Sequence, residues 1–165
     1  MLIKGLYIED DDKNIFVIKA LFEQEGFEIV TLPQLPKKVE DIYPLVLEQQ
    51  VDFLLVDHEL NKKVGYSGFD ALREIRKCDS TIYAILLTNF QVEDFKTEFD
   101  SYDLELHKSE LSDENKLREI SSKIRRACAR SVDLKTLVQV EENCKREKEE
   151  LELLKEIYKR VTETT

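Results

Sequence analysis

The chain has 165 residues, of which 42% are hydrophobic and 36% charged, and its formal net charge is −10 at pH 7. That length fits one domain with an appendage, and the acidic balance argues against nonspecific nucleic-acid binding or attraction to an anionic membrane, because both need clustered Lys and Arg. Neither a secretory signal nor an apolar run of membrane-spanning length is visible, and the three cysteines follow no metal-ligand spacing, so we expect a reduced, cytoplasmic protein.

Short apolar segments alternate with amphipathic ones along the first two thirds of the chain. We expect strands at 3–8, 27–31, 52–56, 81–87 and 103–107, and helices at 14–25, 37–50, 69–77 and 91–100. Gly26 fits the stop of the first helix, and Pro44 must either begin the main body of the second helix or kink it. Five alternations of strand and helix predict an α/β fold with a five-stranded, doubly wound parallel sheet.

The later part of the chain is predicted to be one long helix. All four Gly and all three Pro lie within the first 68 residues, so neither of the strongest helix breakers interrupts the rest of the chain. We place a domain at 1–130 and a helical extension, continuous with the last helix of the domain, at 131–165. Within the domain, the residues expected to face the sheet are Leu117, Ile120, Ile124 and Ala127.

A seven-residue apolar repeat marks the extension, and only Glu147 interrupts it. A narrow seam of this kind, flanked by Lys, Arg and Glu, is typical of a coiled coil. A homodimer through residues 137–161 is the simplest partner, a helical protein partner is also compatible, and a solvent-exposed monomeric helix is the third interpretation. One row of the seam holds Leu137, Cys144, Leu151 and Tyr158, and the other holds Val140, Leu154 and Val161.

Four of the predicted strands end in polar residues. Because the carboxyl ends of parallel strands meet at one edge of a sheet, where α/β folds keep their sites, we expect these side chains to lie together. Any one of them alone is an ordinary solvated strand end, so the prediction depends on the ordered set. The set consists of Glu9 and Asp10 after Ile8, Asp57 after Val56, Thr88 after Leu87, and Lys108 after His107.

This ordered set resembles the receiver domain of two-component response regulators. The resemblance covers roughly residues 1–130, and it rests on Tyr7-Ile8-Glu9-Asp10-Asp11, Leu54-Leu55-Val56-Asp57, Leu86-Leu87-Thr88-Asn89 and Leu106-His107-Lys108. It implies a flavodoxin-like fold and a signalling switch that receives a phosphoryl group from a histidine kinase or phosphotransfer protein. No enzymatic turnover is expected beyond Mg²⁺-dependent self-phosphorylation and autodephosphorylation.

The resemblance also implies a role for each residue. Asp57 would be the phosphoacceptor, while the Thr88 hydroxyl and the Lys108 ammonium would bind the phosphoryl oxygens. Mg²⁺ is the expected ion, because it accepts a few carboxylates while keeping several waters. Its implied ligands are the carboxylates of Glu9, Asp10 and Asp57 and the backbone carbonyl of Glu59.

Several positions depart from the family pattern. Glu105 stands where the family has an aromatic switch residue, so either other residues switch or Glu105 faces solvent permanently. Ser109 replaces the usual proline after the lysine, and we expect a trans peptide bond there. Asn89 replaces a small residue and narrows access to the site, and the segment 61–68 is about three residues longer than the family's loop.

Three functions are compatible with these observations. The leading hypothesis is a phosphoaccepting receiver whose long helix transmits the state by dimerisation or partner binding. The second is a phosphorylation-independent, receiver-like module assembled through its coiled coil, which the three substituted positions favour. The third is a phosphatase or phosphotransferase with Asp57 as a turnover nucleophile and Glu59 as the only nearby acid.

Overall fold

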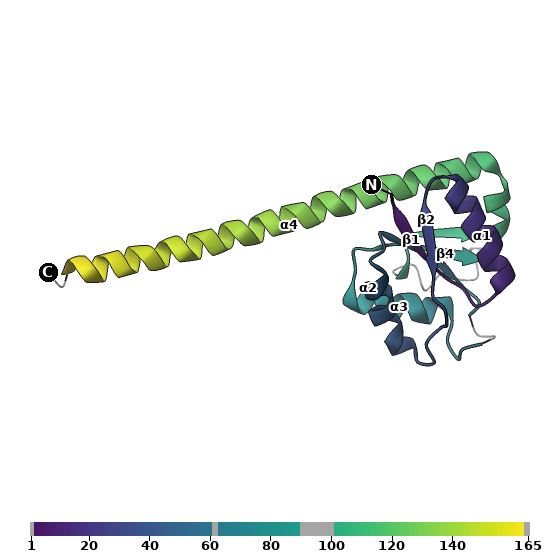
Figure 1. The fold of residues 1–165 in the computed structure, drawn as a ribbon, viewed down its shortest axis with the longest axis horizontal. Coiled ribbons are helices and arrows are strands. Elements are labelled where there is room, and N and C mark those ends of the chain that lie inside the picture. The colour runs from purple at the N-terminus through teal and green to yellow at the C-terminus, as the bar shows by residue number, and fades with distance from the viewer. Residues whose placement is uncertain (1, 61–62, 90–100, 164–165) are drawn as a thin grey trace. The chain divides into compact units, whose positions relative to one another are not determined.

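The computed structural model describes residues 2–60, 63–89 and 101–163. Within them, five parallel strands form one sheet in the order β2-β1-β3-β4-β5, which confirms the predicted doubly wound α/β fold (Figure 1). The elements are β1 (Lys4–Ile8), α1 (Asp12–Gln24), β2 (Glu28–Thr31), η1 (Val39–Asp41), α2 (Ile42–Gln49), β3 (Phe53–Asp57), α3 (Gly68–Cys78), β4 (Tyr83–Thr88), β5 (Leu104–His107), η4 (Lys108–Ser112) and α4 (Glu114–Glu163). The helix expected at 91–100 lies outside the described residues.

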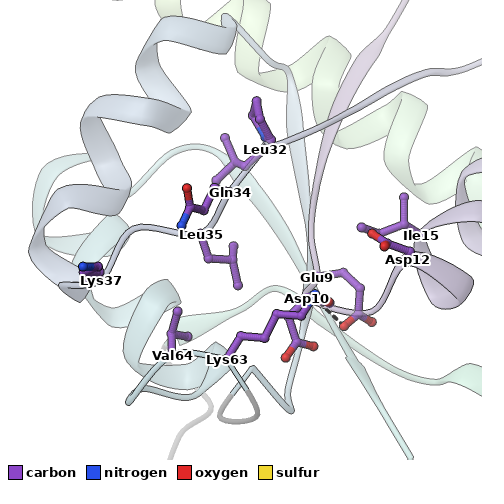
Figure 2. Close-up of a pocket in the computed structure, with 11 residues that line it drawn as sticks. Glu9, Asp10, Asp12, Ile15, Leu32, Gln34, Leu35, Lys37, Lys63 and Val64 are labelled. Carbon is purple, nitrogen blue, oxygen red and sulfur yellow. Dashed lines mark hydrogen bonds between the residues drawn. The ribbon is translucent and has the colours of Figure 1, made fainter.

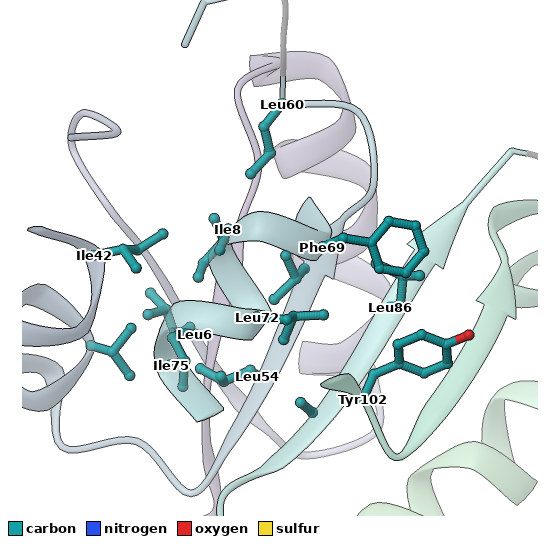
Figure 3. Close-up of a cluster of buried hydrophobic side chains, with 14 of the residues drawn as sticks. Leu6, Ile8, Ile42, Leu54, Leu60, Phe69, Leu72, Ile75, Leu86 and Tyr102 are labelled. Atoms are coloured by element: carbon teal, nitrogen blue, oxygen red, sulfur yellow. The ribbon is translucent and has the colours of Figure 1, made fainter. Parts of the chain in front are cut away.

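Helices cover both faces of the sheet. On one face, α2 and α3 pack over an apolar cluster in which Leu72 and Ile75 of α3 lie against Leu6 and Leu54 of the strands (Figure 3). On the other face, α1 and the first turns of α4 bury a second cluster. The central strand β3 is buried along its whole length, as expected for a parallel strand covered on both sides.

The end of α1 shows how local sequence positions the next strand. Gly26 has a φ of +86°, a left-handed conformation that glycine adopts without strain. The amide of Gly26 donates to the carbonyl of Glu23 at 3.0 Å, and the amide of Phe27 donates to the carbonyl of Phe22 at 3.2 Å. These two bonds, with the Phe22 and Phe27 rings 6.1 Å apart, form a Schellman cap that turns the chain into β2.

Two details of the helices differ from the sequence prediction. The segment expected as one helix at 37–50 is a 3₁₀ turn followed by α2, and Pro44 lies in the first turn of α2, where its missing N–H needs no partner. On α4, Ala127 is only half-buried, and Cys128 is the residue that continues the buried face of Leu117, Ile120 and Ile124.

Contacts divide the chain into two compact units, residues 1–128 and 129–165. Within the second unit, the described residues are helical up to Glu163, and the apolar side chains of the predicted seam are exposed to solvent. No helix in the described part of the chain combines the length and apolarity needed to cross a bilayer.

Candidate functional site

The predicted site residues lie at the carboxyl edge of the sheet. Asp57 is the last residue of β3, is only 3% exposed, and pairs in register with Leu87, so that Thr88 follows one position further along β4. Thr88 is buried too, and its own register partner is His107, the residue before Lys108. The parallel register therefore places Asp57, Thr88 and Lys108 on adjacent strand ends.

Asp57 is held from two sides. Its Oδ1 forms an ion pair with the Lys108 Nζ at 2.5 Å, and its Oδ2 accepts a hydrogen bond from the Glu59 amide at 3.2 Å. Burial raises the pKa of Asp57 to about 6; the bond from Lys108 opposes this rise, and the nearby Glu9 charge adds to it. A buried carboxylate in contact with one lysine is thus poised between its two protonation states near neutral pH.

Glu9 is already fully engaged. Its Oε1 accepts from the backbone amides of Asp10 and Asp11 at 2.8 and 3.2 Å, and its Oε2 accepts from the Tyr7 hydroxyl at 2.9 Å and from the Lys108 Nζ at 3.2 Å. Burial alone would raise the pKa of Glu9, but the bonds from Asp10 and the charge of Lys108 outweigh it, so this pKa is lowered. Lys108 therefore joins Glu9 to Asp57 as a shared cation.

Asp10 differs from Glu9 in its hydrogen bonding. Its Oδ2 is buried and has no hydrogen-bond partner among the described residues. Burial raises the pKa of Asp10, and the adjoining Glu9 carboxylate raises it further. An unmatched carboxylate oxygen of this kind costs free energy until a cation or donor reaches it.

Lys63, which the sequence did not single out, approaches the same carboxylate from the loop between β3 and α3. Its ammonium donates to the backbone carbonyl of Asp10, and the side chain extends across the opening beside that residue (Figure 2). A cavity of about 230 Å³ opens here, and the charged residues that line it are Glu9, Asp10, Asp12, Lys37 and Lys63. Since Lys63 follows no motif, only the unusual length of its loop could have drawn attention to it.

Gly68 permits the close packing behind Asp57, the predicted phosphoacceptor. Its amide donates to the His58 carbonyl at 2.9 Å, and a Cβ on it would lie 2.1 Å from the carbonyl oxygen of Asp57. The helix that starts here is fixed by a capping box, in which Ser67 and Asp70 bond each other's backbone amides. No other residue type fits this point without moving the backbone of Asp57.

The residues around Lys108 explain how a chain without the family proline builds this turn. The Nδ1 of His107 accepts from the Ser109 amide at 3.2 Å, and its Nε2 lies 2.9 Å from the Asn89 carbonyl oxygen. With the proton on Nε2, both contacts are hydrogen bonds. No cis peptide bond occurs in the described residues, so the expectation of a trans bond before Ser109 is confirmed. Ser109 supplies an amide donor that proline lacks.

The environment of Glu105 decides between the two alternatives left open by the sequence. Its Oε2 accepts from the Tyr102 hydroxyl at 2.9 Å, and its Oε1 is buried without a hydrogen-bond partner among the described residues. Permanent exposure of Glu105 to solvent is therefore the wrong alternative. Tyr102 is buried instead and packs on Phe69 with ring centroids 6.0 Å apart (Figure 3).

The donor set suits a hard divalent cation. Within the described residues, no group of three or more His, Cys, Asp or Glu side chains could together hold a metal ion. Mg²⁺ needs fewer, because it is usually bound by one or two carboxylates while its remaining positions keep water or substrate oxygens. Burial, together with the nearby Glu9 charge, raises the pKa values of Asp10 and Asp57, so a cation would be favourable beside them. Both oxygens of Glu9, a predicted ligand, already accept hydrogen bonds.

Residues 6–110, well over half of the chain, match the response regulator receiver domain family. The protein therefore belongs to that family, and it has the CheY-like fold of its members. No curated protein matches the chain.

Solved structures give the same fold. A receiver domain protein from Clostridium thermocellum is 25% identical, with a TM-score of 0.61 over 81% of this chain and 99% of that one. The response regulator TrrA from Thermotoga maritima, solved with Mg²⁺ and BeF, is 24% identical, with a TM-score of 0.56 over 76% and 99%. A structure of the histidine kinase ThkA in complex with TrrA matches at 23% identity and a TM-score of 0.58 over 74% and 98%.

Proposed function

We propose that this receiver domain accepts a phosphoryl group on Asp57 in two-component signalling and transmits its state through the helical extension. The observation that carries the proposal is the position of Asp57, buried at the end of β3 with Lys108 at 2.5 Å and an unmatched Asp10 carboxylate beside it. A buried nucleophile, a fixed cation and spare oxygen ligands are the parts that phosphoryl transfer to a carboxylate needs.

The chemistry of the proposed transfer can be written from these contacts. A deprotonated Asp57 oxygen attacks the phosphorus of a phosphohistidine, the P–N bond breaks, and the imidazole leaves with its electron pair. The Lys108 ammonium then pairs with a phosphoryl oxygen in place of the Asp57 oxygen, and Thr88 is the hydroxyl on the adjacent strand end. Bound Mg²⁺, held by Asp10, Asp57 and the Glu59 carbonyl, would neutralise charge on the transferring group.

Two further assignments belong to this proposal. The phosphodonor is a histidine kinase or phosphotransfer protein, which the kinase complex of TrrA supports by analogy. We also propose that the catalysis of this chain is limited to its own phosphorylation and dephosphorylation.

The test uses beryllofluoride, which mimics an aspartyl phosphate, added to the full chain with and without Mg²⁺. We expect saturable, Mg²⁺-dependent binding that shifts amide NMR signals around β3 and β4 and disappears in Asp57→Asn. Asp41→Asn makes the same chemical change on an exposed residue in η1 and should bind normally. Binding that persists in Asp57→Asn would refute the assignment of the acceptor.

A second candidate is a phosphorylation-independent module, and the half-buried Glu105 favours it. An acid bonded to Tyr102 fills the position from which the family's aromatic switch residue moves. Absence of beryllofluoride binding at every Mg²⁺ concentration, with the fold intact by circular dichroism, would select this function.

A further inference from the structure

The exposed seam of the extension is an apolar feature that the candidate site does not explain. Residues 129–163 form one helix, and the side chains of both seam rows are exposed, with Leu151 at 53% and Tyr158 at 73%. A polar helix of this length is marginal in water by itself, so the apolar residues of the seam need a covering partner. Two properties of the seam identify that partner.

The first property is the placement of the interrupting acid. In a parallel, in-register pair of this helix, each seam residue faces its own copy, so Glu147 faces Glu147 and spoils a single layer. In a fully overlapped antiparallel pair, Glu147 would face Leu151 and Cys144 would face Leu154. Because each of these contacts occurs twice in the symmetric pair, a glutamate would then lie in two layers of the seam instead of one.

The second property is the charge of the flanking positions. In the parallel pair, Glu150 of one copy faces Lys155 of the second copy, and the symmetric contact repeats this attraction. Each remaining flanking pair contains either one charged and one neutral residue or two neutral residues. The antiparallel pair would gain Glu141 beside Lys155, but it would also place Lys148 against Lys148 and Glu150 against Glu150. The parallel arrangement is therefore the one without repulsion between flanking charges.

We propose that residues 137–161 form a parallel, in-register coiled coil with a second copy of this chain. The proposal rests on the proposed function of the extension as the part that assembles, and it adds the identity and direction of the partner. It brings the two Cys144 thiols face to face in the middle of the seam. No other thiol of the chain shares this position, since Cys78 is exposed at the end of α3 and Cys128 is buried.

Disulfide formation between two copies of Cys144 tests this geometry. The Cys78→Ser chain keeps Cys144, the Cys144→Ser chain keeps Cys78, and both keep the buried Cys128. Treatment of each with copper phenanthroline, which oxidises two adjacent thiols to a disulfide, should yield a covalent dimer from the first chain only. The matched exposed thiol at Cys78 controls for random collision, because a disulfide requires Cα atoms within about 7 Å.

Mass under reducing conditions completes the test. Light scattering should give twice the chain mass of 19.4 kDa, and it should give the monomer mass when Leu151 and Leu154 are both changed to Gln. Changing Val138 and Leu153 to Gln removes equally exposed apolar side chains that lie off the seam, and the dimer should survive.

Each of the other outcomes identifies which part of the proposal is wrong. A dimer that does not cross-link through Cys144 would overturn the parallel register while leaving assembly through the extension intact. A reduced wild-type chain of monomer mass, or of trimer mass, would overturn the homodimer, and a larger complex formed only with an added helical protein would do the same. Beryllofluoride binding at Asp57 is measured separately, so its presence preserves the receiver function in all of these cases.

Discussion

The raised pKa of Asp57 links the acceptor to the stability of the domain. An aspartate in an unfolded chain releases its proton near pH 4, whereas burial keeps the folded Asp57 protonated up to about pH 6. The folded state therefore binds more protons across this interval. The stability contributed by Asp57 is fully present below pH 4 and is lost as the pH rises through 6.

Because ionisation of the buried Asp57 costs stability above pH 6, we predict that Asp57→Asn stabilises the domain at pH 7 in the absence of divalent cations. The gain in the free energy of unfolding should be roughly 3 kcal/mol, since the pKa rises from near 4 to about 6 and one pKa unit corresponds to about 1.4 kcal/mol. The gain should vanish at pH 3.5. Urea unfolding at the two pH values measures it. An equal or lower stability of the variant at pH 7 would contradict the burial effect.

Lys63 is predicted to weaken metal binding. Its ammonium contacts the backbone carbonyl of Asp10, whose buried Oδ2 has no hydrogen-bond partner among the described residues. Because a nearby positive charge repels Mg²⁺, Lys63→Met should tighten Mg²⁺ binding by roughly threefold to tenfold, measured by calorimetry. Lys37→Met removes the other lysine of the same cavity and should have a smaller effect. Weaker binding in Lys63→Met would instead make this lysine part of the ligand support.

At the scale of elements, the start of α3 is predicted to be intolerant of any side chain. A Cβ on Gly68 would meet the Asp57 carbonyl oxygen at 2.1 Å, and backbone cannot move aside as a flexible side chain can. Gly68→Ala should lower the free energy of unfolding by roughly 1–3 kcal/mol and disturb beryllofluoride binding. Gly65→Ala, in the same loop with nothing within 4 Å of the added Cβ, is the matched control. If both variants unfold at the same denaturant concentration, the close packing behind Asp57 is not a constraint.

Which elements the sequence could predict depends on how local their signals are. Alternation of apolar runs and amphipathic segments placed all five strands, because a parallel strand covered on both faces must be apolar throughout. Gly26 marked the end of α1 because a left-handed residue is a local requirement. The turn after Lys108 was not predictable, because the contact between His107 and Asn89 joins residues that are distant in sequence.

The features of the site likewise divide into those that the sequence pattern predicts and those that depend on tertiary contacts. The strand-end pattern brought Asp57 and Lys108 together correctly, since the strand order fixes which ends meet. The sequence did not reveal that both oxygens of Glu9 accept hydrogen bonds while Oδ2 of Asp10 accepts none among the described residues. Nor did it reveal that the half-buried Glu105 accepts a hydrogen bond from Tyr102. Those differences depend on side-chain directions that no spacing encodes.

At the scale of the whole molecule, the acid in the seam limits how tightly two copies associate. In the proposed dimer the two Glu147 carboxylates face each other, which costs desolvation and repulsion. Glu147→Leu should therefore lower the dissociation constant by at least about tenfold, measured by sedimentation across a concentration series. Glu149→Leu adds the same apolar area on the opposite side of the helix and should leave the constant nearly unchanged. Equal effects of the two variants would mean that general hydrophobicity drives association.

The contact between Asp57 and Lys108 bears on the fidelity of signalling. If Asp57 accepts a phosphoryl group as proposed, the donor must displace Lys108 before Asp57 can attack, because the carboxylate is already paired with that lysine at 2.5 Å. A small metabolite phosphate brings little binding energy to that exchange, whereas a docked kinase brings an entire interface. In the proposed function, the Lys108 contact would therefore limit phosphorylation of the resting domain by free metabolites, because the lysine is in place before any signal arrives.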